Sequence, residues 1–164
     1  MASQMRLSLV LLGGLEARSA GEEGERHLAK GKPVALLAYL ALTPGRRASR
    51  ERLATLLWSD GSTDAARQNL RQTLWYLKKR LGEILLADDD GVGLVPEARS
   101  DVDEFLEAAQ QRRFAEAVAA YKGDLIPDFA APGAEAFEEW GDLERRRLRA
   151  TYVLCVEEAV RTLL

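Results

Sequence analysis

The stretch DAARQNLRQTLWYLKKRL, residues 64–81, has the spacing of one long amphipathic helix. Its apolar side chains recur at helical spacing and share one face, which we expect to pack against the protein core. This face comprises Ala66, Leu70, Leu74, Leu77 and Leu81. Ser62 or Thr63 is placed to cap the first turn, and Gly82 is placed to end the last one. The pattern therefore predicts a helix with one buried face and one polar face.

Two shorter helices are predicted before this one. Residues 32–42 carry Pro33 in the first turn, followed mainly by leucine and alanine, and Thr43-Pro44-Gly45 stops the pattern. Ser49 is expected to cap a second helix that ends near Trp58 and is followed by a turn. Three consecutive helices of this kind, joined by short turns, can enclose one core.

Short β elements flank the three helices. After the third helix, two apolar runs at 84–87 and 92–95 flank Asp88-Asp89-Asp90-Gly91, and Asp-Gly between apolar runs is typical of a hairpin. Before the first helix, the glycine-interrupted apolar pattern predicts a small β element at residues 5–12 and 15–18, with a charged loop at 21–24. Three helices followed by a hairpin is the element order of a winged helix-turn-helix.

The remaining residues are predicted to be helical. Asp101 is expected to cap a helix that runs to Gln111, a second helix spans 114–121, and a long pattern spans 134–164. The last pattern has an apolar stripe of Leu148, Tyr152, Cys155, Ala159 and Leu163. This stripe calls for a partner helix that the chain does not supply, and no stop signal closes the pattern, so we expect a fragment of a longer protein. The predicted fold is mainly α with small β elements, divided into domains 1–99 and 100–164.

Charge is distributed unevenly along the chain. The net charge is −3, but residues 1–99 contain 15 basic and 12 acidic residues, whereas residues 100–164 contain 8 and 14. Residues 46–80 contain nine basic and three acidic residues. Such a local excess of positive charge is expected of a surface that contacts phosphates, although a solvated helical face would look the same.

The polar face of the predicted helix 64–81 holds side chains that suit base recognition. These are Gln68, Gln72, Trp75 and Lys79, flanked by Arg71 and Tyr76. Glutamine can pair with adenine, arginine with guanine or phosphate, and an exposed aromatic ring can contact thymine methyls or sugars. Trp75 has an alternative interpretation, in which it packs against the hairpin or the downstream helices.

Other arginines suit contacts that do not depend on sequence. Arg46, Arg47 and Arg50 lie in the turn and at the start of the second helix, which crosses the DNA backbone in a helix-turn-helix. A solvated turn is the alternative for each of them. Arg67 lies nearer the core edge of its helix and is expected to clamp a phosphate or to form a salt bridge.

Several segments together resemble the bacterial antibiotic-regulatory protein family called SARP, whose DNA-binding part is similar to the OmpR and PhoB winged helix. In the first part of the chain these segments are Leu11–Leu15, Gly31–Pro33 with Leu36–Leu42, Ser49–Ala54 with Leu56–Trp58, and Ala66–Leu74. Downstream segments resemble the family's transcriptional activation domain, built of tetratricopeptide-like repeats; these are Asp101–Phe105, Phe114–Ala117, Tyr121–Asp124, Glu139–Trp140 and Glu144–Arg149.

The resemblance implies a sequence-specific transcription regulator that activates promoters. Proteins of this type bind tandem DNA repeats with the third helix, as side-by-side protomers, and recruit RNA polymerase. The chain departs from the family at residues 88–90, whose carboxylates would be repelled by phosphates, and in its short helical part. Arg99 is an alternative basic contact near the hairpin. The arginines of residues 145–149 could form a second nucleic-acid patch, but we interpret them as a solvated face paired with Glu138, Glu139, Glu144 and neighbouring helices.

Two other classes of protein are weighed against this one. An interaction module that binds only protein, with Trp75 as an anchor, is the main alternative. An enzyme is not expected, because no glycine-rich phosphate loop is present, the single histidine, His27, lies in a predicted loop, and Cys155 lies on an apolar stripe. We expect no metal, no cofactor and no membrane segment, and a cytoplasmic, nucleoid-associated protein that binds double-stranded DNA. The resemblance implies RNA polymerase as a further partner, and a homodimer or tandem protomers on DNA.

Overall fold

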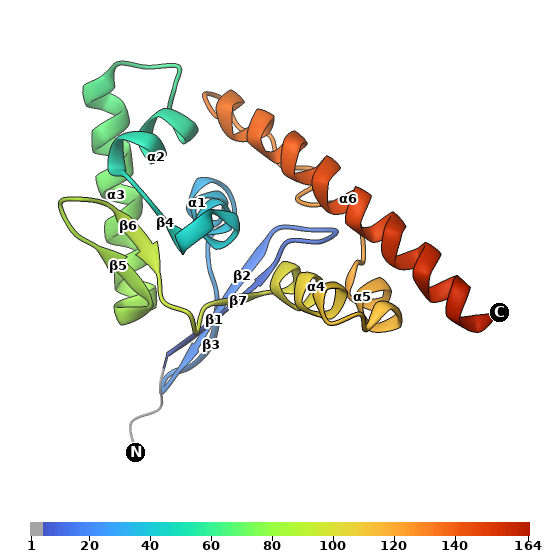
Figure 1. Ribbon diagram of the computed structural model, residues 1–164. Helices are drawn as coiled ribbons and strands as arrows, with labels where there is room; N and C mark the ends of the chain where they lie inside the picture. The colour runs from blue at the N-terminus through green and yellow to red at the C-terminus, as the bar shows by residue number, and fades with distance from the viewer. Residues whose placement is uncertain (1–4) are drawn as a thin grey trace.

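The computed structural model describes residues 5–164 and shows six α-helices and two small sheets within that range (Figure 1). The helices are α1 Lys32–Leu42, α2 Arg50–Leu57, α3 Thr63–Leu81, α4 Asp101–Gln110, α5 Phe114–Ala120 and α6 Glu135–Leu163. Short 3-10 turns at Pro44–Arg46 and Gly82–Ile84 precede β4 and β5. The predicted winged helix followed by a helical segment is confirmed as the fold.

The first sheet has the strand order β3-β2-β1-β7 and lies at the base of α1 (Figure 1). Its strands are β1 Arg6–Val10, β2 Glu16–Gly21, β3 Gly24–His27 and β7 Arg99–Ser100, and β7 runs parallel to β1. The prediction of a loop around residues 21–24 and at His27 is wrong in part, because residues 24–27 form an edge strand. All four residues of β3 are exposed, so backbone pairing with β2 holds the strand without an apolar face that the sequence would reveal.

The second sheet has the order β4-β6-β5 and forms the wing. Its strands are β4 Arg47–Ala48, β5 Leu85–Ala87 and β6 Val92–Leu94. The predicted Asp-Gly hairpin is confirmed, and its turn is closed by the Asp88 carboxylate, which accepts hydrogen bonds from the N–H groups of Asp90 and Gly91 at 2.9 and 3.0 Å. Gly91 is required here because a Cβ atom would lie 2.7 Å from the Ala48 carbonyl oxygen.

The three helices of the winged helix begin and end close to their predicted positions. Ser49 caps α2 by accepting a hydrogen bond from the Arg52 N–H, and Ser62, rather than Thr63, caps α3 through the Ala65 N–H. Gly82 ends α3 with a φ of 55°, a conformation that favours glycine. The five predicted apolar residues of α3 are all buried. The opposite face of α3 is therefore held toward solvent.

Asp101 does not cap α4 as predicted. Ser100 is the N-cap and forms a reciprocal capping box with Asp103. The Asp101 carboxylate instead accepts hydrogen bonds from the backbone N–H groups of Leu11 and Leu12 at 2.9 and 3.1 Å. Burial raises the pKa of this carboxyl, against the lowering effect of these hydrogen bonds. Asp101 thus fixes the first turn of α4 to the end of β1.

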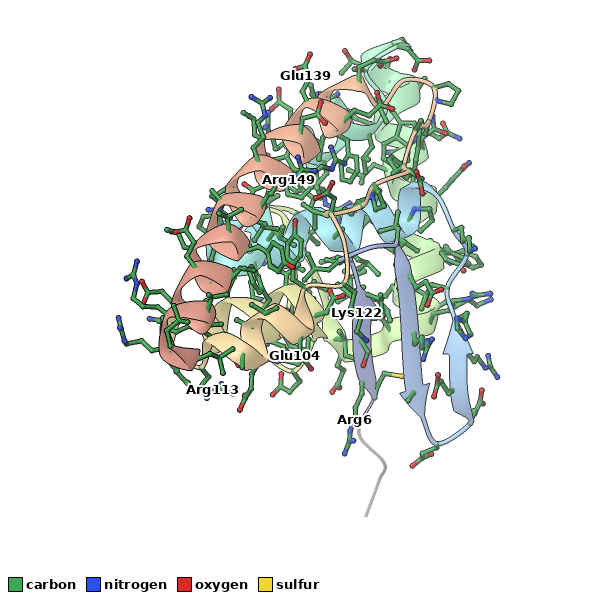
Figure 2. The ribbon with its side chains drawn as sticks, turned by 90° about the vertical axis from the view of Figure 1, so that its right-hand side faces the viewer. Arg6, Glu104, Arg113, Lys122, Glu139 and Arg149 are labelled. Carbon is green, nitrogen blue, oxygen red and sulfur yellow. The ribbon has the colours of Figure 1, made fainter. Side chains whose placement is uncertain are left out.

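The helix α6 packs across both predicted parts of the chain. Near its start, the Trp140 ring makes an edge contact with Tyr39 of α1, with ring centroids 5.0 Å apart. Farther along, Tyr152 stacks on Tyr121 at 4.3 Å, and Figure 2 shows the C-terminal half of α6 lying along α4 and α5, near Arg113. Buried residues from 7 to 155 form one continuous core, so the domain boundary at residue 99 stays a prediction.

The apolar stripe of α6 is covered in part by this chain itself, which corrects the expectation that its partner helix is missing. Leu148 and Cys155 are buried against the core, and α5 is the main neighbour of this part of the helix. The last turns differ, because Leu163 at the end of the stripe is exposed.

Candidate nucleic-acid interface

The outer face of α3 presents most of the predicted recognition side chains to solvent. They are Arg67, Gln68, Arg71, Gln72, Trp75 and Lys79, all of them exposed. Trp75 is 64% exposed, and the Lys79 Nζ lies 4.5 Å from the centroid of its ring. The alternative in which Trp75 packs against the hairpin or the downstream helices is wrong. Within residues 5–164, the two arginines and two glutamines make no side-chain hydrogen bond or ion pair.

Tyr76 lies apart from this face. Its hydroxyl accepts a hydrogen bond from the Ala29 N–H at 2.8 Å, and the Arg80 guanidinium covers its ring at 4.1 Å. Tyr76 thus holds α3 to the segment between β3 and α1, and the structure does not bring it together with the exposed recognition side chains.

Arg46 also lies away from the predicted phosphate surface. Its guanidinium donates to the Ala98 carbonyl oxygen and lies 3.8 Å from the Asp103 Oδ2 atom, and its Nε is buried without a hydrogen-bond partner in the described chain. The backbone at Arg46 has a φ of 56°, in the left-handed region that residues other than glycine rarely adopt. Arg46 connects the wing to the helical segment instead of facing solvent.

Arg47 and Arg50 attach the turn of the wing to the start of α2. The Arg47 guanidinium contacts both carboxylate oxygens of Asp88 at 2.7 Å, and the Arg50 Nε donates to the Asp88 carbonyl oxygen at 2.8 Å. The hydrogen bond from Arg47 is the main cause that lowers the pKa of Asp88 below its ordinary value, and the N–H of Asp90 adds to it. One of the three aspartates at the tip is therefore neutralised by a predicted phosphate contact.

A shallow groove of about 400 Å³ separates α2, α3 and the turn of the wing. It is lined by Arg50, Glu51, Arg67, Leu70, Arg71 and Asp89. In Figure 1 the loop between β5 and β6 lies beside α3 and below α2. Sequence reasoning missed Glu51 and Asp89 as members of this surface. Glu51 lies beside α3 because α2 packs on α3, and Asp89 lies there because Arg47 and Arg50 dock the wing.

Arg99 does not lie free near the wing. It donates to the Glu107 Oε1 atom at 2.8 Å, and this hydrogen bond is the main cause that raises the pKa of its guanidinium. Its alternative role as a basic contact beside the hairpin is therefore not favoured by the geometry.

The arginines of α6 are mostly paired, as predicted. Most of their partners differ from the predicted ones. Arg145 donates to the carbonyl oxygens of Leu125 and Ile126 at 2.9 and 2.8 Å, and Arg149 pairs with Asp124. Only the Arg147–Glu144 pair, at 2.6 Å, uses a predicted acidic partner. Arg145 and Arg149 thus fasten the segment 124–126 to the helix, and Figure 2 shows Arg149 midway along α6.

Among residues 5–164, no group of three or more His, Cys, Asp or Glu side chains is placed to hold a metal ion. The thiol of Cys155 is buried in the core, and burial raises its pKa. No helix in this range is long and apolar enough to cross a membrane.

The fold defined by these elements is a winged helix followed by a packed helical segment. The same fold occurs in Mycobacterium tuberculosis EmbR, solved in complex with a low-affinity phosphopeptide, with a TM-score of 0.66 and 22% sequence identity. The match covers 93% of this chain and 44% of the EmbR chain, so this chain spans less than half the length of that structure. No protein-family model and no curated protein matches the sequence. The likeness to EmbR establishes the fold.

Proposed function

We propose that this protein is a sequence-specific transcription regulator of the SARP kind that reads double-stranded DNA with α3. The observation that supports this best is the exposed face of α3, where two arginines and two glutamines project without partners in the described chain. Removing such polar side chains from water costs free energy unless a ligand supplies matching hydrogen-bond donors and acceptors in place of the water. Base edges and phosphates in a major groove supply those groups.

The positions of these side chains along α3 suggest which of them contact bases and which contact the sugar-phosphate backbone. Gln68, Arg71 and Gln72 occupy the first half of the helix, the part that contacts base edges in a helix-turn-helix. Trp75 and Lys79 follow one and two turns later, where an aromatic face can contact sugars or thymine methyls and an ammonium can contact phosphate. The guanidinium groups of Arg47 and Arg50, which also contact Asp88, add positive potential near the start of α2.

The helical segment supplies the activating part of the proposal. Residues 1–99 form the DNA-binding domain and residues 100–164 form part of an activation domain that recruits RNA polymerase, with protomers side by side on tandem repeats. These roles rest on the resemblance to the family. The contacts of α4 and α6 with the winged helix, through Asp101 and Trp140, support a fixed placement of this segment relative to bound DNA.

A protein-binding module is the second candidate, and the exposure of Trp75 favours it. A tryptophan that is 64% exposed on a helix face is the type of side chain that anchors a protein interface. This candidate requires no dependence on DNA sequence and no strong dependence of DNA binding on salt.

Selection from a random double-stranded DNA pool at two salt concentrations, followed by sequencing, tests the proposal. We expect an enriched motif that repeats at a spacing near one helical turn, and affinity that falls steeply as salt rises. The variant Gln72→Ala is expected to lose the enrichment. Arg147→Ala, which removes an exposed cation from α6, serves as a control and is expected to keep it. An unenriched pool together with no binding at low salt would favour the protein-binding module.

A further inference from the structure

The groove between α2, α3 and the turn of the wing is lined by carboxylates as well as by guanidinium groups. A surface that only bound phosphates would have no carboxylates. Three guanidinium groups line it, from Arg50, Arg67 and Arg71, together with the carboxylates of Glu51 and Asp89. The groove therefore has a single net positive charge. Removing one carboxylate would double this charge without moving a cation.

Asp89 is the carboxylate that the wing contributes to the groove. The neighbouring residues Asp88 and Asp90 do not line it. Asp88 pairs with Arg47 and closes the turn, and Asp90 is not among the residues that line the groove. In the described chain the Asp89 side chain makes no hydrogen bond and no ion pair within 4.0 Å. Because Arg47 binds the Asp88 carboxylate and Arg50 binds the Asp88 carbonyl oxygen, Asp89 is kept beside α3 although its side chain contributes no bond to the hairpin.

We propose that Asp89 is a specificity-determining residue that lowers the affinity of the α3 surface for DNA of arbitrary sequence, a role that rests on the proposed function. A phosphate that entered the groove to reach Arg67 or Arg71 would bring a full negative charge close to the carboxylate. All of these groups lie in one small groove, within roughly the screening length of about 8 Å at physiological salt. The repulsion is therefore only partly screened.

A base edge meets a smaller penalty than a phosphate at the same place. The acceptors of guanine have partial charges, so Asp89 disfavours them less, and a bidentate contact with Arg71 has its own hydrogen-bond geometry to stabilise it. Binding to unrelated DNA, which depends on phosphate contacts, loses more from Asp89 than binding to the selected motif does. Asp89 thereby increases the ratio of the two affinities, and this gives the unusual acidic tip of the wing a function.

The variant Asp89→Asn tests this role, with Asp90→Asn as a matched control from the same turn. Equilibrium binding is measured for the enriched motif and for an unrelated duplex of equal length at several salt concentrations. We expect Asp89→Asn to raise the affinity for the unrelated duplex by roughly threefold to tenfold, to raise the affinity for the motif less, and to steepen the salt dependence. Asp90→Asn is expected to change both affinities slightly and by the same factor.

A second comparison identifies the groups on which Asp89 acts. In an Arg67→Ala/Arg71→Ala background, Asp89→Asn is expected to have no effect beyond that of Asp90→Asn, since the coupled cations are gone. The inference is overturned if Asp89→Asn matches Asp90→Asn in the wild-type background, or if it raises both affinities equally. Wild-type protein that selects a motif under either of these outcomes leaves the proposed function intact. Wild-type protein that binds no DNA at low salt overturns both.

Discussion

The helices α3 and α6 both carry several arginines on long amphipathic patterns, yet the structure uses them in opposite ways. On α6, Arg145 and Arg149 reach the segment 124–126 and bind its carbonyl and carboxylate oxygens. On α3, Arg67 and Arg71 find no such oxygen within hydrogen-bonding distance in the described chain. The same residue type therefore fastens the fold in one helix and is left for a ligand in the other.

The difference follows from what packs beside each helix. The segment between α5 and α6 folds back along α6, so acceptors lie beside its arginines. The neighbours of α3 are α1, α2 and the wing, and none of them places an acceptor within hydrogen-bonding distance of the Arg67 or Arg71 side chain in the described chain. A count of basic residues in the sequence cannot separate these cases, whereas a count of unpaired cations in the structure can.

The largest expected effect concerns the unpaired side of this comparison. Arg71→Ala and Gln72→Ala should each lower the preference for the selected motif over unrelated DNA by about 1–3 kcal/mol, the value of one good bidentate base contact. Thermal unfolding should change little, because neither side chain has a partner in the described chain. Competition binding with matched and mismatched duplexes gives the preference. Equal loss on all sequences would show that these residues bind phosphate rather than bases.

The paired side of the comparison predicts the reverse outcome. Arg145→Ala leaves the carbonyl oxygens of Leu125 and Ile126 without their guanidinium donor, and both residues are buried. We expect a loss of about 1–2 kcal/mol in the free energy of unfolding, with unchanged affinity for DNA. Urea denaturation and DNA titration of the same preparation measure both. If Arg145→Ala lowers the affinity for DNA without changing the free energy of unfolding, α6 belongs to the nucleic-acid interface, and its arginines do not differ in role from those of α3.

Arg46 offers a finer test, because it adjoins Arg47 in sequence but belongs to the paired class. Arg46→Ala removes the donor to the Ala98 carbonyl and the ion pair with Asp103, so we expect a loss of about 1 kcal/mol of stability. Arg47→Ala should instead remove one phosphate contact and so flatten the salt dependence of DNA binding by about one unit. An Arg46→Ala variant of normal stability with a flattened salt dependence would contradict the structural assignment.

Local patterns in the sequence were sufficient wherever the deciding contacts are local. The period of α3 predicts its buried face, Ser49 and Ser62 predict the start of two helices, and Asp-Gly predicts the hairpin, because each depends on neighbours within a turn of the chain. The exposed recognition face of α3 follows from the same period, since burying one face of a helix fixes the other.

Contacts between distant segments account for the errors. Asp101 was assigned as a cap, yet it binds backbone about 90 residues away, and Arg46 reaches Ala98 across 52 residues. The exposed strand β3 lacks any apolar alternation, so only its pairing with β2 reveals it. The place of Asp89 beside Arg71 needs the wing to be docked on α2. No pattern of neighbouring residues encodes such placements.

The smallest effect tests whether the paired arginines stabilise the fold at all. Hydrogen bonds from Arg149, and then from Tyr121, hold the pKa of Asp124 below its ordinary value of 3.8. A carboxyl whose pKa is lower in the folded than in the unfolded state stabilises the protein above the ordinary pKa, and this contribution is lost as the pH falls through the lower, folded value. Because both side chains are partly exposed, we expect only about 0.5–1 kcal/mol between wild type and Asp124→Asn at neutral pH.

This difference should shrink as the pH falls from about 5 to below the ordinary pKa of the carboxyl, as measured by urea denaturation at each pH. Asp128→Asn is the matched control, since Asp128 is an exposed acid of the same loop with no ion pair in residues 5–164. A constant difference for Asp124→Asn across this range would mean that its charge contributes nothing. The stabilising contribution of the α6 arginines would then come from the hydrogen bonds of Arg145 to backbone carbonyls, and α3 and α6 would differ in geometry rather than in electrostatics.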